Sequence, residues 1–301
     1  MKKGLEKCYH YFMKKKISGL LLLLFIYLTA FFVGFLVFTL VSKVIDHIII
    51  NLLIADVAAT IYVFIASIVF RTASVYDPYW SVQTIIIYLL LQFKYGFNLG
   101  NSLVLAFLAF WAIRLTVNFI KTFNDISYVD WRYKMLEQKS KKLYPLISLF
   151  GIHLFPTLIV FAASIPLFSY VIYQIEFSYL NLIGLAIMLL GTLLELISDI
   201  DMHKFKANRK DRSEIINVGL WKYSRHPNYL GEILFWFGAA LTLIIPHFEY
   251  WYLATGAILN YLMFLFISIP MAENNMKKYK PGFDEYKKRV RMLLPFKKRS
   301  H

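Results

Sequence analysis

The sequence predicts an all-α, polytopic membrane protein, a helical bundle with about eight transmembrane helices and amphipathic segments on the cytoplasmic side. Composition is the first reason, because 59% of the 301 residues are hydrophobic and the mean hydropathy is +0.56. Soluble domains are only about 45–50% apolar. The second reason is that the apolar residues form long runs, and a helix needs about 20 of them to cross the hydrocarbon core. The third is that the basic residues lie in short blocks between these runs.

Eight apolar runs are the predicted spans. They cover residues 18–42, 48–70, 81–95, 101–122, 144–173, 179–202, 229–246 and 249–270. The third run is short, and the fifth contains Pro156 and Pro166, which predict a kink or a re-entrant break. We expect residues 1–70 to form an N-terminal transmembrane helix pair and residues 71–301 to form a membrane catalytic domain.

The basic residues orient the predicted spans. Of the 33 Lys and Arg residues, 29 lie before the first run or in the segments 121–142, 204–225 and 277–299. Eight spans place all of these segments on one side of the membrane. Because positive charge is concentrated on the cytoplasmic side, both termini are predicted to be cytoplasmic. The chain would be a multi-pass protein of the plasma or inner membrane in a bacterium, or of the endoplasmic reticulum in a eukaryote.

The net charge of +15 limits the classes of partner. Because the cations are divided among short blocks beside apolar runs, they favour anionic lipid headgroups, and nucleic acid is not an expected partner. The single cysteine, Cys8, excludes an internal disulfide and a cysteine-based metal cluster. His226 has no second histidine or cysteine at a zinc-ligand spacing, so no metal site is expected.

Polar residues at the ends of the apolar runs are candidates for a site, because ionisable groups at membrane depth usually line a cavity or a functional site. The sequence Tyr76-Asp77-Pro78-Tyr79-Trp80-Ser81 opens the third run. Asp77 as the N-cap of a helix that begins in an aromatic belt would be a purely structural explanation. The alternative is that Asp77 and Tyr79 form hydrogen bonds with a substrate.

Arg114 lies deep inside the fourth run, and Trp111 shares its helical face by the i, i+3 spacing. A buried guanidinium needs an anion, either a carboxylate of the protein or a phosphate of a ligand. The structural alternative is an ion pair with Asp56, Asp77 or Glu232.

The sixth run ends in a polar helical face. Glu195, Asp199, Met202 and Lys206 follow the i, i+4, i+7 and i+11 spacing of one face, which predicts a polar cavity at this end of the span. Lys206 belongs to a basic stretch, residues 204–212, that suits either anionic lipid or the phosphate of a cofactor.

The seventh run opens with Tyr-Ser-Arg-His-Pro-Asn-Tyr-Leu-Gly-Glu at residues 223–232. A soluble loop has little reason to place Arg225, Asn228, Tyr229 and Glu232 at the mouth of an apolar helix. Asn228 and Glu232 are four residues apart, so their side chains share one helical face. We therefore expect this block to form a binding site with the polar end of the sixth run.

Six sequence elements occur in a fixed order along the chain. They are Tyr76–Ser81, Arg114-Leu-x-x-Asn118, Asp130-Trp-Arg-Tyr133, Glu195-x-x-x-Asp199-x-x-Met202-x-x-Phe205-Lys206, the block Gly219–Glu232, and Tyr286-x-x-x-Val290-x-x-x-x-Pro295. Together they resemble the DUF1295 family of the steroid 5-alpha-reductase C-terminal superfamily, over about residues 71–297. The Arg-His-Pro-Asn-Tyr block also resembles isoprenylcysteine and phospholipid methyltransferases, so the combination of elements carries the resemblance.

The resemblance implies an NADPH-dependent oxidoreductase that reduces a carbon–carbon double bond of an unsaturated, enone-type lipid or steroid-like substrate. The residues that it places at the cofactor are Arg114, Asp199, Lys206, Asn228, Tyr229 and Glu232, and we add Arg225 from the same block. Lys206 stands where the reductases have an arginine, and Glu195 stands where they have an asparagine. Trp111 stands near their catalytic tyrosine, so the proton donor must be another group. We expect Asp77 and Tyr79 to be the catalytic residues, with Tyr76 as a further candidate donor.

Two other functions fit parts of the sequence. One is an S-adenosylmethionine-dependent methyltransferase of lipids or prenylated substrates. Such enzymes carry paired glutamates before the final amphipathic stretch, where this chain has the single Glu273. The other is a non-catalytic lipid-binding protein, which predicts that no soluble cofactor binds. In every case the expected partner is a membrane lipid or a lipophilic small molecule.

Overall fold

The computed structural model describes residues 2–294, and the side chains of residue 10 and of residues 13–294. The chain is all-α, as predicted, and residues 2–294 contain no named strand. Several basic residues used in the orientation argument, namely Lys2, Lys3, Lys7 and those at 297–299, have side chains outside the described set, and so has Pro295 of the last motif.

The helices form two compact units. Unit 1 comprises Met1–Leu90 and Leu115–Phe161, and unit 2 comprises Leu91–Arg114 and Ala162–His301. Each unit is a group of helices that contact one another within that unit. The division at residue 70 into an N-terminal pair and a catalytic domain stays a prediction.

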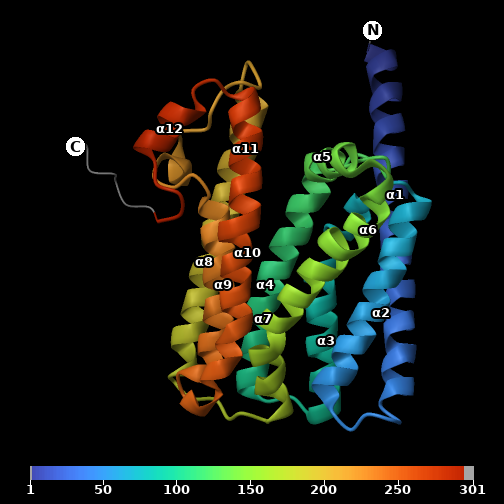
Figure 1. The fold of residues 1–301 in the computed structure, drawn as a ribbon, viewed down its shortest axis with the longest axis vertical. Coiled ribbons are helices and arrows are strands. Elements are labelled where there is room, and N and C mark those ends of the chain that lie inside the picture. The colour runs from blue at the N-terminus through green and yellow to red at the C-terminus, as the bar shows by residue number, and fades with distance from the viewer. Residues whose placement is uncertain (1, 295–301) are drawn as a thin grey trace. The chain divides into compact units, whose positions relative to one another are not determined.

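Unit 1 contains two long helices and several short ones (Figure 1). Its elements are α1 (Lys2–Val41), α2 (Ile48–Val69), η1 (Ala73–Tyr76), most of α3 (Tyr79–Tyr95), the end of α4 (Leu99–Thr122), α5 (Trp131–Ser140), η2 (Lys141–Leu143), α6 (Tyr144–Ile147), η3 (Ser148–Leu154) and the start of α7 (Phe155–Ile172). α1 and α2 run side by side (Figure 1). Their contact is made by apolar residues such as Ile26 and Val63, and Tyr76 and Tyr79 join the same buried cluster.

Unit 2 contains the end of α3, most of α4, the end of α7 and the C-terminal helices. These C-terminal elements are α8 (Asn181–Asn208), η4 (Gly219–Lys222), α9 (Pro227–Ile244), η5 (Phe248–Ala254), α10 (Thr255–Met263), η6 (Phe264–Ser268), α11 (Ile269–Tyr279) and α12 (Phe283–Arg289). α8 and α9 lie side by side along most of their length (Figure 1). Met188, Phe235 and Leu243 are fully buried in this unit.

Helices occupy all eight predicted spans, and six helical segments of the described residues are long and apolar enough to cross a membrane. The helices α3 and α9 are not among these six. α3 has 17 residues, which gives a length of about 26 Å and places it at the lower limit for a span. α9 has 18 residues, and its first turns contain the polar Asn228 and Glu232.

The irregularity predicted in the fifth span lies before its first proline. The π-helical segment η3 ends at Leu154, two residues before Pro156. A proline supplies no backbone N–H, which favours a local change of hydrogen-bond pattern in the preceding turn. α7 continues through Pro166 without interruption, so neither proline ends the helix.

Candidate functional site

A buried ionic cluster in unit 2 surrounds Arg114. The Arg114 guanidinium forms ion pairs with Glu195 and with Asp199, the latter at 2.7 Å, and lies 3.9 Å from a carboxylate oxygen of Glu232. Only 8% of Arg114 is exposed. We call Arg114, Glu195, Asp199 and Glu232 the Arg114 cluster. The prediction that Arg114 pairs with an anion is therefore confirmed.

The anions differ in part from those expected. Glu232 was one of the three carboxylates considered, whereas Asp56 and Asp77 belong to unit 1 and have other partners there. Glu195 and Asp199 take their place because they are four residues apart on one face of α8. The predicted convergence of Glu232 with Asp199 is confirmed, since both approach the same guanidinium.

Two tryptophans hold the carboxylate of Glu232. Trp111 donates its indole N–H to Glu232 Oε2 at 3.1 Å, and Trp236 donates to Oε1 at 2.8 Å. The Trp111 ring stacks on Phe235 with centroids 4.7 Å apart. Trp111 therefore orients an acid of the cluster, and its indole offers no acidic hydroxyl. Trp236 was missed in the sequence, where a tryptophan in an apolar helix gives no separate signal.

Close approach of α8 and α9 brings Glu195 and Glu232 together. A Cβ atom on Gly191 would lie 2.5 Å from the carbonyl oxygen of Gly231, and a Cβ on Gly231 would lie 2.5 Å from Cγ of Glu195. Only glycine fits at either position. Small residues allow helix backbones to pack closely in membranes. Here Gly191 and Gly231 allow α8 and α9 to approach closely enough for Glu195 and Glu232 to lie beside Arg114.

Arg225 lies in a second polar group, which ties the C-terminal segment to the start of α9. Its Nε donates to Glu273 at 2.8 Å, its Nη1 donates to the carbonyl of Val290 at 2.6 Å, and its backbone N–H donates to the carbonyl of Arg291. Among the described residues, no hydrogen bond or ion pair joins Arg225 to the Arg114 cluster. Its expected contact with a cofactor stays a prediction.

His226 supports the same junction. Burial lowers the pKa of His226, and the bond to Glu273 opposes this shift. The imidazole is therefore neutral near pH 7, and its 3.3 Å contact with Glu273 is a hydrogen bond between a neutral ring and a carboxylate. The ring also stacks on Tyr229, with centroids 5.3 Å apart.

The other predicted cofactor residues lie at the ends of α8 and α9. Asn228 and Tyr229 are half-buried in the first turn of α9, one turn before Glu232. Lys206 is exposed in the last turn of α8. Burial, together with the nearby cations Arg209 and Lys206, lowers the pKa of Lys280. Three cations thus gather at this end of α8, and such clusters bind phosphate.

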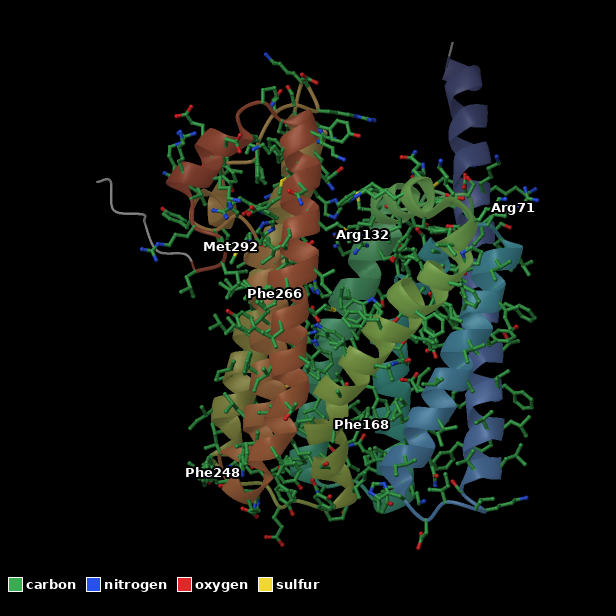
Figure 2. The ribbon with its side chains drawn as sticks, viewed as in Figure 1. Arg71, Arg132, Phe168, Phe248, Phe266 and Met292 are labelled. Atoms are coloured by element: carbon green, nitrogen blue, oxygen red, sulfur yellow. The ribbon has the colours of Figure 1, made fainter. Side chains whose placement is uncertain are left out.

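Asp77 and Tyr79 in unit 1 do not form a pair. Asp77 accepts a hydrogen bond of 2.5 Å from the Tyr133 hydroxyl and lies 3.7 Å from Arg132, which Figure 2 labels on α5. Burial raises the pKa of Asp77 to about 6, although Arg132 and the Tyr133 hydroxyl favour the ionised form. Asp77 also has helical dihedral angles, φ −51° and ψ −45°, so it does not have the extended conformation of an N-cap residue.

Tyr79 instead contacts Asp56, which the sequence suggested only as an ion-pair partner of Arg114. The Tyr79 hydroxyl donates to Asp56 Oδ1 at 3.5 Å, and Gln83 Nε2 donates to Asp56 Oδ2 at 2.9 Å. We call Asp56, Tyr79 and Gln83 the Asp56 cluster. All three residues are buried. Asp56 could have been recognised as an isolated acid inside the apolar run 48–70.

Comparison with known proteins gives a family and three relatives. The family model described as "Protein of unknown function (DUF1295)" matches residues 63–290. A protein of Schizosaccharomyces pombe described as uncharacterized is 23% identical over 199 residues, which are 58% of this chain and 56% of that protein. The 3-oxo-5-alpha-steroid 4-dehydrogenase 1 of Macaca fascicularis and that of Homo sapiens are each 30% identical over 115 residues, or 38% of this chain.

The matched regions leave much of each relative uncovered. They span 40% of the macaque dehydrogenase and 41% of the human one. No solved structure matches the chain.

Proposed function

Because the chain belongs to the DUF1295 family, we propose that it is an integral membrane reductase that uses NADPH. The substrate would be a lipophilic molecule with a carbon–carbon double bond conjugated to a ketone. The likeness to two 3-oxo-5-alpha-steroid 4-dehydrogenases supports this class of reaction. The observation that carries the proposal is the Arg114 cluster, because a charged, enclosed site inside a membrane bundle is costly unless it has a function.

The residues of unit 2 fit a phosphate-bearing cofactor. The buried Nε of Arg114 has no hydrogen-bond partner in the described part of the chain, so one charge-assisted donor is available. Lys206, Arg209 and Lys280 add a positive group at the end of α8. Asn228 and Glu232 present an amide and a carboxylate from one face of α9. We propose that these side chains and Arg114, Asp199, Arg225 and Tyr229 bind and orient NADPH.

Reduction of a double bond needs a hydride on one carbon and a proton on the other. When bound, NADPH supplies the hydride. We propose that Tyr79 gives the proton through its hydroxyl. Asp77 would donate a hydrogen bond to the ketone oxygen, because a carboxyl group with a pKa of about 6 is partly protonated near neutral pH.

We further propose that both termini face the cytoplasm and that the basic blocks contact anionic lipid. The single cysteine, Cys8, allows a direct test with a membrane-impermeant maleimide. Labelling in sealed vesicles of known orientation should occur only where the cytoplasmic face is accessible. Labelling from the opposite face would contradict the proposed topology.

Enzyme activity is tested with the purified protein in lipid vesicles. NADPH oxidation is followed while single enone lipids, including 4-ene-3-one steroids, are added, and mass spectrometry measures the gain of two hydrogens in the product. We expect NADPH oxidation and reduced product in equal amounts for at least one substrate. Transfer of a methyl group from S-adenosylmethionine to the lipid would contradict the proposal and support a methyltransferase.

A further inference from the structure

Asp56 is a buried acid in the middle of an apolar helix. It lies in α2, only 4% of it is exposed, and residues 48–69 are long and apolar enough to cross a membrane. No Lys, Arg or His side chain of the described residues lies within ion-pair distance of it. A carboxylate without a cation in such a place is so costly that the group is held in its neutral, protonated form instead.

Asp56 has one ordinary hydrogen bond and one long contact, which are too few to stabilise a buried carboxylate. Gln83 donates to one carboxyl oxygen at 2.9 Å, while the Tyr79 hydroxyl lies 3.5 Å from the other. The second distance is longer than the roughly 2.5–3.0 Å of ordinary hydrogen bonds between oxygen atoms, so this contact is weak. A hydroxyl group can donate or accept, so a protonated Asp56 can donate to the Tyr79 oxygen.

Other hydroxyl groups extend this contact. Thr60 lies one turn after Asp56 on α2 and forms a hydrogen bond with Tyr79. Its Oγ1 is 3.1 Å from Oγ1 of Thr157, which in turn lies 2.8 Å from the Tyr76 hydroxyl. Both Thr60 and Thr157 are fully buried. A connected series of hydroxyl groups that ends at a carboxyl group can pass a proton.

We propose that Asp56 is a proton store that resupplies Tyr79 during the reduction. This inference rests on the proposed function and deepens it. The region matched by the family begins at residue 63, inside α2, so Asp56 lies in the same helix just before the matched region. Asp56 would act on the substrate through Tyr79, which makes it a relay residue.

Each turnover requires three proton transfers. The O–H bond of Tyr79 breaks as a C–H bond forms on the substrate carbon that does not receive the hydride. The resulting tyrosinate takes the proton of Asp56, and the Asp56 carboxylate takes one from water. The electron pair comes with the hydride of the nicotinamide cofactor, so the substrate gains two hydrogens and the cofactor is oxidised.

A hydrophobic carbodiimide tests the stored proton without any need for activity, because carbodiimides react with protonated carboxyl groups. The intact protein in vesicles is treated near neutral pH, and labelled peptides are identified by mass spectrometry. We expect Asp56 to be modified. Asp199, which pairs with Arg114 at 2.7 Å, should stay unmodified and serves as the internal control. An unmodified Asp56 in protein that remains folded would overturn the proposal, whatever the reductase assay gives.

Kinetics test the relay itself. Asp56→Asn keeps the size of the side chain and an acceptor for Gln83 but stores no proton. We expect kcat to fall about 10- to 100-fold with NADPH affinity unchanged, and the solvent deuterium isotope effect on kcat to rise. Asp56→Glu should restore part of the rate. An unchanged kcat and isotope effect in Asp56→Asn would overturn the relay. If the protein without substitutions shows no reductase activity with any substrate, the proposed function itself is rejected.

Discussion

The Arg114 cluster of unit 2 and the Asp56 cluster of unit 1 enclose carboxyl groups in different ways. Three carboxyl groups of the Arg114 cluster lie around one guanidinium. Among the described residues, the acid of the Asp56 cluster accepts hydrogen bonds from an amide and from a phenol hydroxyl. Breaking a buried ion pair costs several kcal/mol, whereas a hydrogen bond between neutral groups contributes about 1 kcal/mol. The first arrangement suits a charged ligand, and the second suits a group that gains and loses a proton.

Removal of the cation from the first cluster should have the largest effect. In Arg114→Leu, Glu195, Asp199 and Glu232 are left without their cation. We expect the free energy of unfolding to fall by about 3–5 kcal/mol. The matched change in the other cluster, Asp56→Asn, should cost only about 1 kcal/mol. Thermal unfolding in one detergent measures both, and equal losses would contradict the contrast between the clusters.

Substitution at the start of α9 should affect binding more than folding. Asn228→Ala removes an amide group and Glu232→Gln removes a negative charge, and both remove little apolar volume. We expect NADPH affinity to fall about 10- to 100-fold while the protein stays folded. The competing explanation is that both residues only stabilise the helix junction, and it predicts lost thermal stability with unchanged affinity. Unchanged cofactor affinity in both variants would reject their place in the site.

Substitution of a glycine can test whether α8 and α9 pack closely at the Arg114 cluster. Gly191→Ala places a Cβ 2.5 Å from the carbonyl oxygen of Gly231, whereas Gly151→Ala meets no atom closer than 3.9 Å. Both changes remove a helical glycine, so Gly151→Ala controls for backbone entropy. We expect Gly191→Ala to be less stable than the control by about 1–3 kcal/mol. Equal stabilities would mean that α8 and α9 do not pack this closely.

Asp77 should give an effect that depends on pH. Its pKa of about 6 lies above the usual value of 3.8 for an aspartate, so the folded state binds its proton more tightly than the unfolded state. The free energy of unfolding should therefore fall as pH rises from about 4 to about 6, by at most about 3 kcal/mol. Asp77→Asn should lack this change. Unfolding curves at several pH values measure it, and identical pH dependence in both proteins would contradict the shifted pKa.

The features that follow from local spacing were predictable. The apolar runs gave the positions of the helices, and the i, i+4 spacing placed Glu195 and Asp199 on one face of α8. Arg114 inside an apolar run implied a buried anion, and the structure supplies it. In each case the pattern lies within one helix, and the helical repeat of about 3.6 residues is enough to interpret it.

The partners across helices were not predictable in the same way. Nothing near Asp56 in the chain indicates that Gln83 and Tyr79 will reach it from α3. Arg225 looked like a cofactor ligand, yet its described partners are Glu273 and carbonyls of the C-terminal segment. Such contacts join residues tens of positions apart, and they depend on tertiary packing, which a single sequence does not encode as a period.

Cofactor binding tests the central claim most directly. The detergent-solubilised protein is titrated with NADPH, NADH and S-adenosylmethionine, with Glu232→Gln measured in parallel. A membrane reductase with its cofactor in unit 2 should bind NADPH more tightly than the other two, and the variant should lose most of that affinity. Preferential binding of S-adenosylmethionine, or no binding of any soluble cofactor by folded protein, would contradict the account.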